Sequence, residues 1–354
     1  MTIFYANSFT KRLVWYIICE MDQTNNRKKI DYITFLQSFA IFCIVLGHLT
    51  PIKISSPDNL LYYRVIRELV YSFHLPLFFL ISGFLFYLTY KFGKSYLEYF
   101  KKKCKKILIP FFGLTALAVV LKIVLFHDFV LSSKSLTDLV LYPGTGGVAA
   151  FWFIIALFWL LILAPCFKYL QENHFKVFII FTVLAGIVSA FMGVDEKYNY
   201  FGILNSIHFL FYFLAGMLMC SYKETITKFL SDRRVFAAFL IIFSVLMVIY
   251  QFMYHTHLIK FILSIIGIAG VFGIALICSE HGKKFLFGWI DGYYYQIYLI
   301  HSFIHLPLKA LYKAGIISYN AEIITALFAL IIIPILITKA IRKYAPALSV
   351  FIGL

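Results

Sequence analysis

The chain has 354 residues, of which 62% are hydrophobic and only 14% are charged, and its mean hydropathy is +0.88. This balance excludes a soluble globular domain of the same size and predicts an all-α, polytopic membrane protein. The net charge of +16 fits either nucleic-acid binding or cytoplasmic loops rich in Lys and Arg. Because the basic residues cluster between the apolar spans, we favour the loops and expect no nucleic-acid partner.

The six cysteines are scattered singly along the chain. None forms a CxxC pair or has the spacing of a metal-ligand set, so the sequence predicts neither a disulfide framework nor a zinc site. We therefore expect no metal and free thiols.

The first 26 residues differ from the rest. The apolar stretch Leu13–Cys19 is too short to span a bilayer, and no small-residue cleavage site follows it, so a signal peptide is not expected. An interfacial segment and a true start at Met21 are both compatible with this extension. Residues 27–345 are expected to form a single transmembrane domain, since no tandem repeat or long linker divides them.

Apolar stretches of helix length predict a bundle of about ten transmembrane helices. They lie at residues 31–51, 69–90, 105–126, 148–170, 174–192, 201–221, 234–253, 258–279, 288–311 and 321–340. Lys and Arg are concentrated at the N-terminus, at the C-terminus and in alternate loops, which places both termini in the cytoplasm. The expected location is the cell (inner, or cytoplasmic) membrane.

The first span carries Gln37 and, near its far end, His48. At 100° per residue they return to within about 20° of the same helix face, roughly 16 Å apart along the axis. Ionisable groups within lipid are costly and usually mark a pathway or a reaction site. This face therefore suits a site that is reached from one side of the membrane and acts near the other.

Further histidines are predicted at a depth similar to that of His48. His74 lies in the second span, where Pro76 and the small pair Ser82-Gly83 allow a kink and close helix approach. His301 and His305 in the ninth span share one face at i, i+4. A lone histidine in a helix is more often a hydrogen-bonded core residue, but several at one depth favour proton transfer.

The run from Lys101 to Lys106 begins the third span on the predicted cytoplasmic side. Two interpretations are open. The run is either a solvated positive-inside cluster that contacts anionic lipid, or a mouth that binds the phosphates of a cytosolic cofactor. Trp152, at the start of the fourth span, fits an interfacial aromatic belt.

Taken together, these motifs resemble the acyltransferase-3 family of integral-membrane O-acyltransferases, and most closely its fucose 4-O-acetylase-like and polysaccharide O-acetyltransferase branch. The resemblance covers about residues 28–340 and is carried by Leu46-Gly47-His48, Ser72-Phe73-His74-Leu75-Pro76-Leu77-Phe78-Phe79, Ser82-Gly83-Phe84, the basic run, Trp152-Phe153, Phe213-Leu214-Ala215-Gly216 and Tyr298-Leu299-Ile300-His301. The span-one histidine and the Phe-His-x-Pro-Leu-Phe-Phe run are its most specific parts.

The resemblance implies a ten-helix bundle that moves an acyl group, commonly acetyl, from cytosolic acyl-CoA to a carbohydrate hydroxyl. His48 occupies the position of the family's essential histidine. Gln37 stands where the family usually has arginine or lysine, and a pair of family arginines appears as Lys103 and Lys106. These three residues are expected to bind the donor.

We expect the following roles for the site residues, as a hypothesis drawn from the placement of these side chains together with the resemblance. His48 is the expected general base, or first accepts the acyl group itself, with His74 and His301 orienting it or polarising the carbonyl. Ser82, Trp152 and Tyr298 are expected to line the substrate site. The expected partners are acyl-CoA (acetyl-CoA as donor), a carbohydrate or lipid-linked glycan acceptor, and membrane lipids.

A transporter or polysaccharide-export component without acyl-transfer activity is the alternative. Basic loops and intramembrane histidines also suit proton-coupled transport. Against it, the sequence shows no internal repeat that pairs the two halves and no Asp or Glu well inside a span.

Overall fold

The computed structural model describes residues 31–49, 61–93, 95–126, 141–142, 151–252, 256–280 and 288–354, and these ranges contain helices and no β-strand. The N-terminal extension 1–26 and the proposed start at Met21 lie outside the described residues. The helices within these ranges are α2 (Asp31–Leu49), α3 (Leu61–Thr89), α4 (Tyr96–Lys103), α5 (Ile109–Phe126), α8 (Trp152–Asn173), α9 (Phe175–Phe191), α10 (Ile203–Ser221), α11 (Lys223–Leu230), α12 (Arg233–Phe252), α13 (His257–Glu280), α14 (Tyr294–Lys313) and α15 (Tyr319–Tyr344).

Each of the ten predicted spans coincides with one of these helices, which confirms the all-α membrane class. Eight helices in the described part of the chain are long and apolar enough to cross a membrane. The other two are α9, which has 17 residues, and α14, which has 20 residues and carries the polar side chains of the candidate site. Spanning helices are expected here because a helix satisfies its own backbone hydrogen bonds in lipid.

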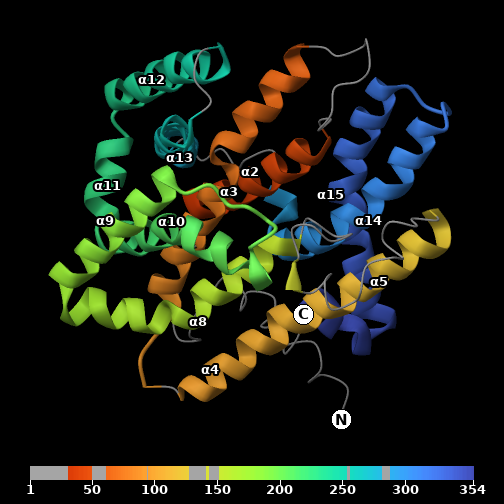
Figure 1. Ribbon diagram of the computed structural model, residues 1–354, viewed down its shortest axis with the longest axis horizontal. Helices are drawn as coiled ribbons and strands as arrows, with labels where there is room; N and C mark the ends of the chain where they lie inside the picture. Colours follow the sequence, from red (N-terminus) through yellow and green to blue (C-terminus); the bar gives the residue numbers. More distant parts are fainter. Residues whose placement is uncertain are drawn as a thin grey trace.

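Two helix starts differ from the prediction. α3 begins at Leu61 instead of residue 69, because Arg67 and Glu68 lower the local hydropathy without ending the helix. The third span is part of a longer rod, in which α4 continues through a π-helical turn, Cys104–Leu108, into α5. Figure 1 shows this rod along one edge of the molecule.

α3 is the central helix of the bundle and packs against α2, α10 and α13. Its contact with α10 is tightest at Gly83 and Gly216. A Cβ atom at Gly83 would overlap the carbonyl oxygen of Phe213, and one at Gly216 would overlap that of Leu80. The predicted close approach at Ser82-Gly83 is therefore confirmed, and it relies on small residues as membrane helix interfaces commonly do.

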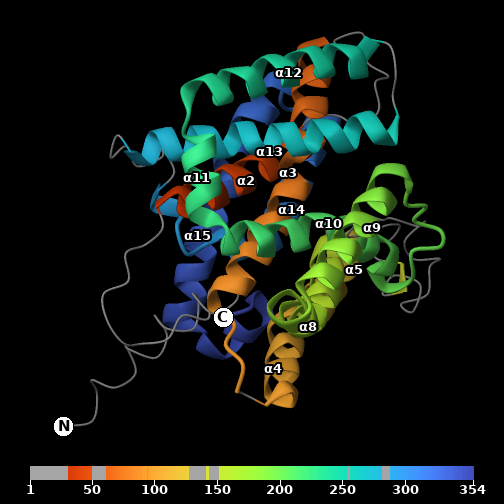
Figure 2. The same ribbon diagram turned by 90° about the vertical axis from the view of Figure 1, so that its left-hand side faces the viewer.

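The periphery of the bundle is apolar and exposed, as expected for helices that face lipid. α12 lies alongside α13 at one edge (Figure 2). Its side chains Ile241, Val245 and Val248 are all more than half exposed. α14 and α15 pack against each other at another edge (Figure 1).

Candidate active site

Two imidazole rings from distant parts of the sequence meet inside the bundle. His48, in the last turn of α2, is half-buried, and His301 of α14 is 1% exposed. Their ring centroids lie 5.1 Å apart with an interplanar angle of 41°. His48 and His301 were predicted to lie at a similar depth in the membrane, and the contact between their rings agrees with that prediction.

The protonation pattern of His301 follows from its neighbours. Its Nδ1 atom lies 2.6 Å from the carbonyl oxygen of Tyr298 and 3.2 Å from that of Ile297. Because carbonyl oxygens only accept hydrogen bonds, Nδ1 carries the proton and donates it. The lone pair is therefore on Nε2, which lies 3.4 Å from the Ser302 hydroxyl.

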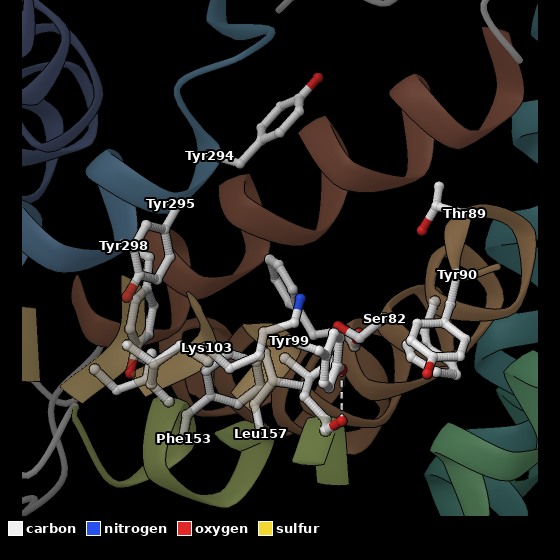
Figure 3. Close-up of a pocket in the computed structure, with 15 residues that line it drawn as sticks. Ser82, Thr89, Tyr90, Tyr99, Lys103, Phe153, Leu157, Tyr294, Tyr295 and Tyr298 are labelled. Atoms are coloured by element: carbon white, nitrogen blue, oxygen red, sulfur yellow. Dashed lines mark hydrogen bonds between the residues drawn. The ribbon is translucent and has the colours of Figure 1, made fainter. Parts of the chain in front are cut away.

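A cavity of about 70 Å³ lies between α3, the α4–α5 rod, α8 and α14. Tyr295 and Tyr298 form one side, Ser82 and Tyr90 form another, and the Lys103 side chain lies between them (Figure 3). Tyr298 is the link to the histidine pair, because its ring centroid lies 5.9 Å from that of His301. The cavity therefore runs from a lysine on the predicted cytoplasmic side to within one helical turn of the pair.

The two lysines predicted to bind the donor, Lys103 and Lys106, have different surroundings. The Nζ atom of Lys103 lies 5.1 Å from the centroid of the Tyr99 ring and faces the cavity. Lys106 is only 8% exposed and lies behind the wall, where its carbonyl oxygen accepts a hydrogen bond from the Tyr295 hydroxyl at 3.1 Å. The π-helical turn Cys104–Leu108, which follows Lys103 and contains Lys106, was not predicted, and such turns occur often at functional sites.

Comparison with known proteins decides between the families that such a membrane site allows. The chain matches the acyltransferase-3 family model, described as an acyltransferase domain, over residues 30–339. The chain belongs to the acyltransferase-3 family. Searches of the curated proteins and of the solved structures return no match. The protein is accordingly a multi-pass membrane acyltransferase.

Two further residues predicted for this acyltransferase site lie on α3. The Nδ1 atom of His74 lies 2.7 Å from the carbonyl oxygen of Val70, so this ring also carries its proton on Nδ1. The His74 ring contacts that of Tyr71 edge-on, with centroids 4.9 Å apart. Ser82 lines the cavity, and its hydroxyl donates to the carbonyl oxygen of Phe78 at 2.8 Å.

Gln37 and Trp152 lie away from the Lys103 cavity. Gln37 is buried on α2 and is not among the residues that line this cavity. Trp152 stacks on Phe209, with ring centroids 5.8 Å apart, and lines a second pocket. Its neighbour Phe153 lines the first cavity and contacts the Tyr298 ring. The predicted substrate-lining residues are thus divided between two spaces.

A buried acid near the histidines was missed by the sequence reasoning. Glu322, in the first turn of α15, is only 4% exposed, and its carboxylate lies 3.4 Å from the Nε2 atom of His305. Hydropathy places Glu322 at the edge of a span, where an acid is ordinarily solvated. The i, i+4 spacing of His301 and His305 was the available signal, since it puts His305 one turn beyond the pair.

A buried cation on α8 was also missed. The Lys168 ammonium donates to the carbonyl oxygens of Tyr87 and Tyr90, at the end of α3. A cation there satisfies carbonyl groups that have no partner within the helix and interacts favourably with the helix dipole. Because Tyr90 lines the cavity, Lys168 helps to fix the wall opposite Tyr295.

Proposed function

We propose that this acyltransferase moves an acetyl or other short acyl group from cytosolic acyl-CoA to a hydroxyl of a surface or lipid-linked polysaccharide in the cell membrane. The observation that carries the proposal is the cavity that extends from Lys103 to Tyr298, next to the His301–His48 pair. A cavity that joins a basic residue to the surroundings of a buried imidazole suits a donor whose charged end stays on the basic side, and at about 70 Å³ it must widen to admit the reactive arm.

The basic end of the cavity supplies the recognition of the donor. Lys103 provides an ammonium for the phosphates of CoA, and lysine binds phosphate as a point charge on a flexible stem. Beyond it the wall is formed mainly by aromatic and aliphatic side chains, among them Phe86, Phe153 and Leu157. Such a wall suits the uncharged pantetheine arm, whose thioester would then lie near Tyr298.

His48 acts as the general base in this proposal. Its imidazole takes the proton of the acceptor hydroxyl while the hydroxyl oxygen attacks the thioester carbonyl carbon. The carbon–sulfur bond breaks, and the imidazolium returns the proton to the departing thiolate. The products are the O-acyl ester and free CoA, so the enzyme ends the cycle in its starting protonation state. His301 supports the ring of His48 through the contact between the two imidazoles.

The experiment that tests this proposal compares His48→Ala with His174→Ala. His174 is exposed at the junction of α8 and α9, so its loss controls for removal of an imidazole as such. We expect His48→Ala to lower acetyl transfer from acetyl-CoA by at least about 100-fold, because a positioned base contributes roughly 10²–10⁴. Membrane expression should stay unchanged in both variants. Retained O-acetylation in His48→Ala would refute the role of His48.

A further inference from the structure

A second cavity, of about 230 Å³, lies on the side predicted to face away from the cytoplasm. It is formed by the corresponding ends of α3, α8, α9, α10 and α13. Its volume is below the roughly 300–1,000 Å³ of pockets that enclose drug-sized ligands. The space therefore suits one small ring or a single unit of a longer chain.

The wall of this pocket combines aromatic faces with hydrogen-bonding groups. Trp152, Phe209 and Phe261 supply apolar rings, and Tyr212 with Ser264 supplies hydroxyls that bond each other at 2.6 Å. An apolar lining with a few convergent polar groups is the usual composition of a small-molecule site. A pyranose matches it, because its C–H faces pack on aromatic rings and its edge carries hydroxyls.

Two polar side chains offer acceptors to a ligand. The Asn205 amide donates one hydrogen bond to Glu196 at 3.2 Å, which leaves its carbonyl oxygen and its second N–H for other partners. Within the described part of the chain, the Nδ1 atom of His208 is buried without a hydrogen-bond partner. A buried polar atom in this condition is costly, and a ligand hydroxyl that bonds it is favoured accordingly.

The charge of the pocket indicates an uncharged ligand. Lys260 lines it and interacts electrostatically with Glu68 of α3. Asn205 is in turn bonded to the carboxylate of Glu196. Lys260 is the one Lys or Arg among the residues described as lining the pocket, and Glu68 lies near it, so no excess of fixed positive charge is arranged for a phosphate or carboxylate.

The pocket adjoins the candidate catalytic residues. Tyr71 lines it, packs against Gly47 next to His48, and contacts the His74 ring. On its inner side, Phe79 lies between Phe153 of the first cavity and Phe209 of the second, with centroid distances of 4.9 and 4.5 Å. An acceptor held here would approach the histidine pair from the side opposite to the donor.

From this arrangement we infer that the second cavity binds one uncharged pyranose unit of the acceptor glycan and presents its hydroxyl toward His48. The inference rests on the proposed function and adds to it the acceptor site and its chemical class.

The test fills the pocket from its loop. Gly193 lines it with an ordinary backbone conformation, and among the described residues the nearest neighbour of a Cβ atom there is the His257 ring, at 3.1 Å. Gly193→Leu therefore blocks the space without disturbing a helix interface. Lys197→Leu, on the same loop at an exposed position, is the control. His208→Gln is a second pocket variant that changes polarity with little change in volume.

The first measurement is acetyl transfer from acetyl-CoA to a panel of methyl pyranosides by the purified full chain in lipid nanodiscs. We expect Gly193→Leu and His208→Gln to raise the KM for the glycoside about tenfold, as expected from loss of a packed or bonded contact, with the KM for acetyl-CoA unchanged. Transfer that proceeds with the same glycoside KM in all variants would overturn the inference and leave the proposed function intact.

The second measurement is direct binding of the same methyl pyranosides without donor, by saturation-transfer NMR. Binding that is lost in Gly193→Leu and kept in Lys197→Leu supports the pocket. If such binding occurs while the wild-type chain transfers no acetyl group, the proposed function fails and the binding site remains. Absence of binding to the wild-type chain, or binding unaffected by Gly193→Leu, overturns the inference.

Discussion

Lys103 provides the sharpest test of how the donor is bound. Within the basic run, Lys101 and Lys105 are exposed and Lys106 is buried, whereas Lys103 is half-buried and lines the cavity. Lys105 is exposed on the same run, with one π-helical position between them. Lys103→Met keeps an apolar stem against Tyr99 and removes only the charge. Lys105→Met makes the same chemical change outside the cavity.

The expected size of the effect follows from the position of the ammonium. A hydrogen bond to a charged group contributes about 1.5–3 kcal/mol when it is well shielded, which is about 10- to 150-fold in affinity. Lys103 is only half-buried, so solvent screening places the loss near the lower limit, at about tenfold. The substitution also removes the cation–π contact between the Lys103 ammonium and the Tyr99 ring, which lowers the stability of the protein by roughly 0.5–1 kcal/mol.

The assay compares acetyl-CoA with S-acetylpantetheine, which lacks the phosphorylated nucleotide of CoA and therefore all of its phosphates. Binding of acetyl-CoA and of S-acetylpantetheine to detergent-purified protein is measured by calorimetry for both variants. We expect Lys103→Met to weaken acetyl-CoA about tenfold and S-acetylpantetheine hardly at all, with Lys105→Met near wild type for both. Equal losses in the two variants would indicate a general positive-inside or lipid-binding cluster, and an equal loss for the two donors would refute the phosphate contact.

Two further predictions concern stability, and thermal unfolding in detergent checks both. Gly83→Ala should destabilise the protein by about 3 kcal/mol, since its methyl group would overlap the Phe213 carbonyl. Gly270→Ala, which has ordinary contacts in α13, should gain about 0.5–1 kcal/mol, and a similar loss in both would contradict the tight α3–α10 contact. Glu322→Leu should cost about 3–5 kcal/mol as one half of a buried pair. The double variant with His305→Leu should lose less than the sum of the single variants, and strict additivity would show that the two side chains are not coupled.

The helices could be predicted from sequence because lipid imposes one strong constraint. Every backbone group within the hydrocarbon must be bonded within its own helix, so apolar length alone locates the spans. The helix ends were predicted less well where charged residues belong to the helix, because hydropathy alone assigns them to a loop. At the start of α3, Arg67 and Glu68 are part of the helix. The π-helical turn of Cys104–Leu108 depends on packing between helices, which hydropathy does not report.

The depth of the site residues was predictable, but their partners were not. The positions and predicted orientation of the spans placed His48 and His301 at one level of the membrane, and the ring contact between them depends on how α2 and α14 rotate about their axes. The orientation of a helix about its axis also explains why Trp152 and Phe153, which are neighbours in the sequence, line different cavities. Consecutive helix positions differ by about 100° around that axis. The burial of Glu322 was not predicted. An acid in the first turn of a helix is buried only when another helix covers it, and the sequence does not show which helices are neighbours.

The two cavities suggest why such a site is built across a membrane. A charged CoA would have to lose several kcal/mol of hydration per ion to cross the bilayer, and a sugar would have to leave its hydroxyls unbonded. With the donor phosphates at Lys103 and the acceptor beside Tyr212, neither molecule needs to cross. In the proposed transfer the acyl group passes directly from the thioester to the acceptor hydroxyl at His48, while the ring contacts of Phe79 separate the two cavities. In this proposal the imidazole of His48 is the group that both substrates must reach, and its ring, in the last turn of α2, is half-buried against His301.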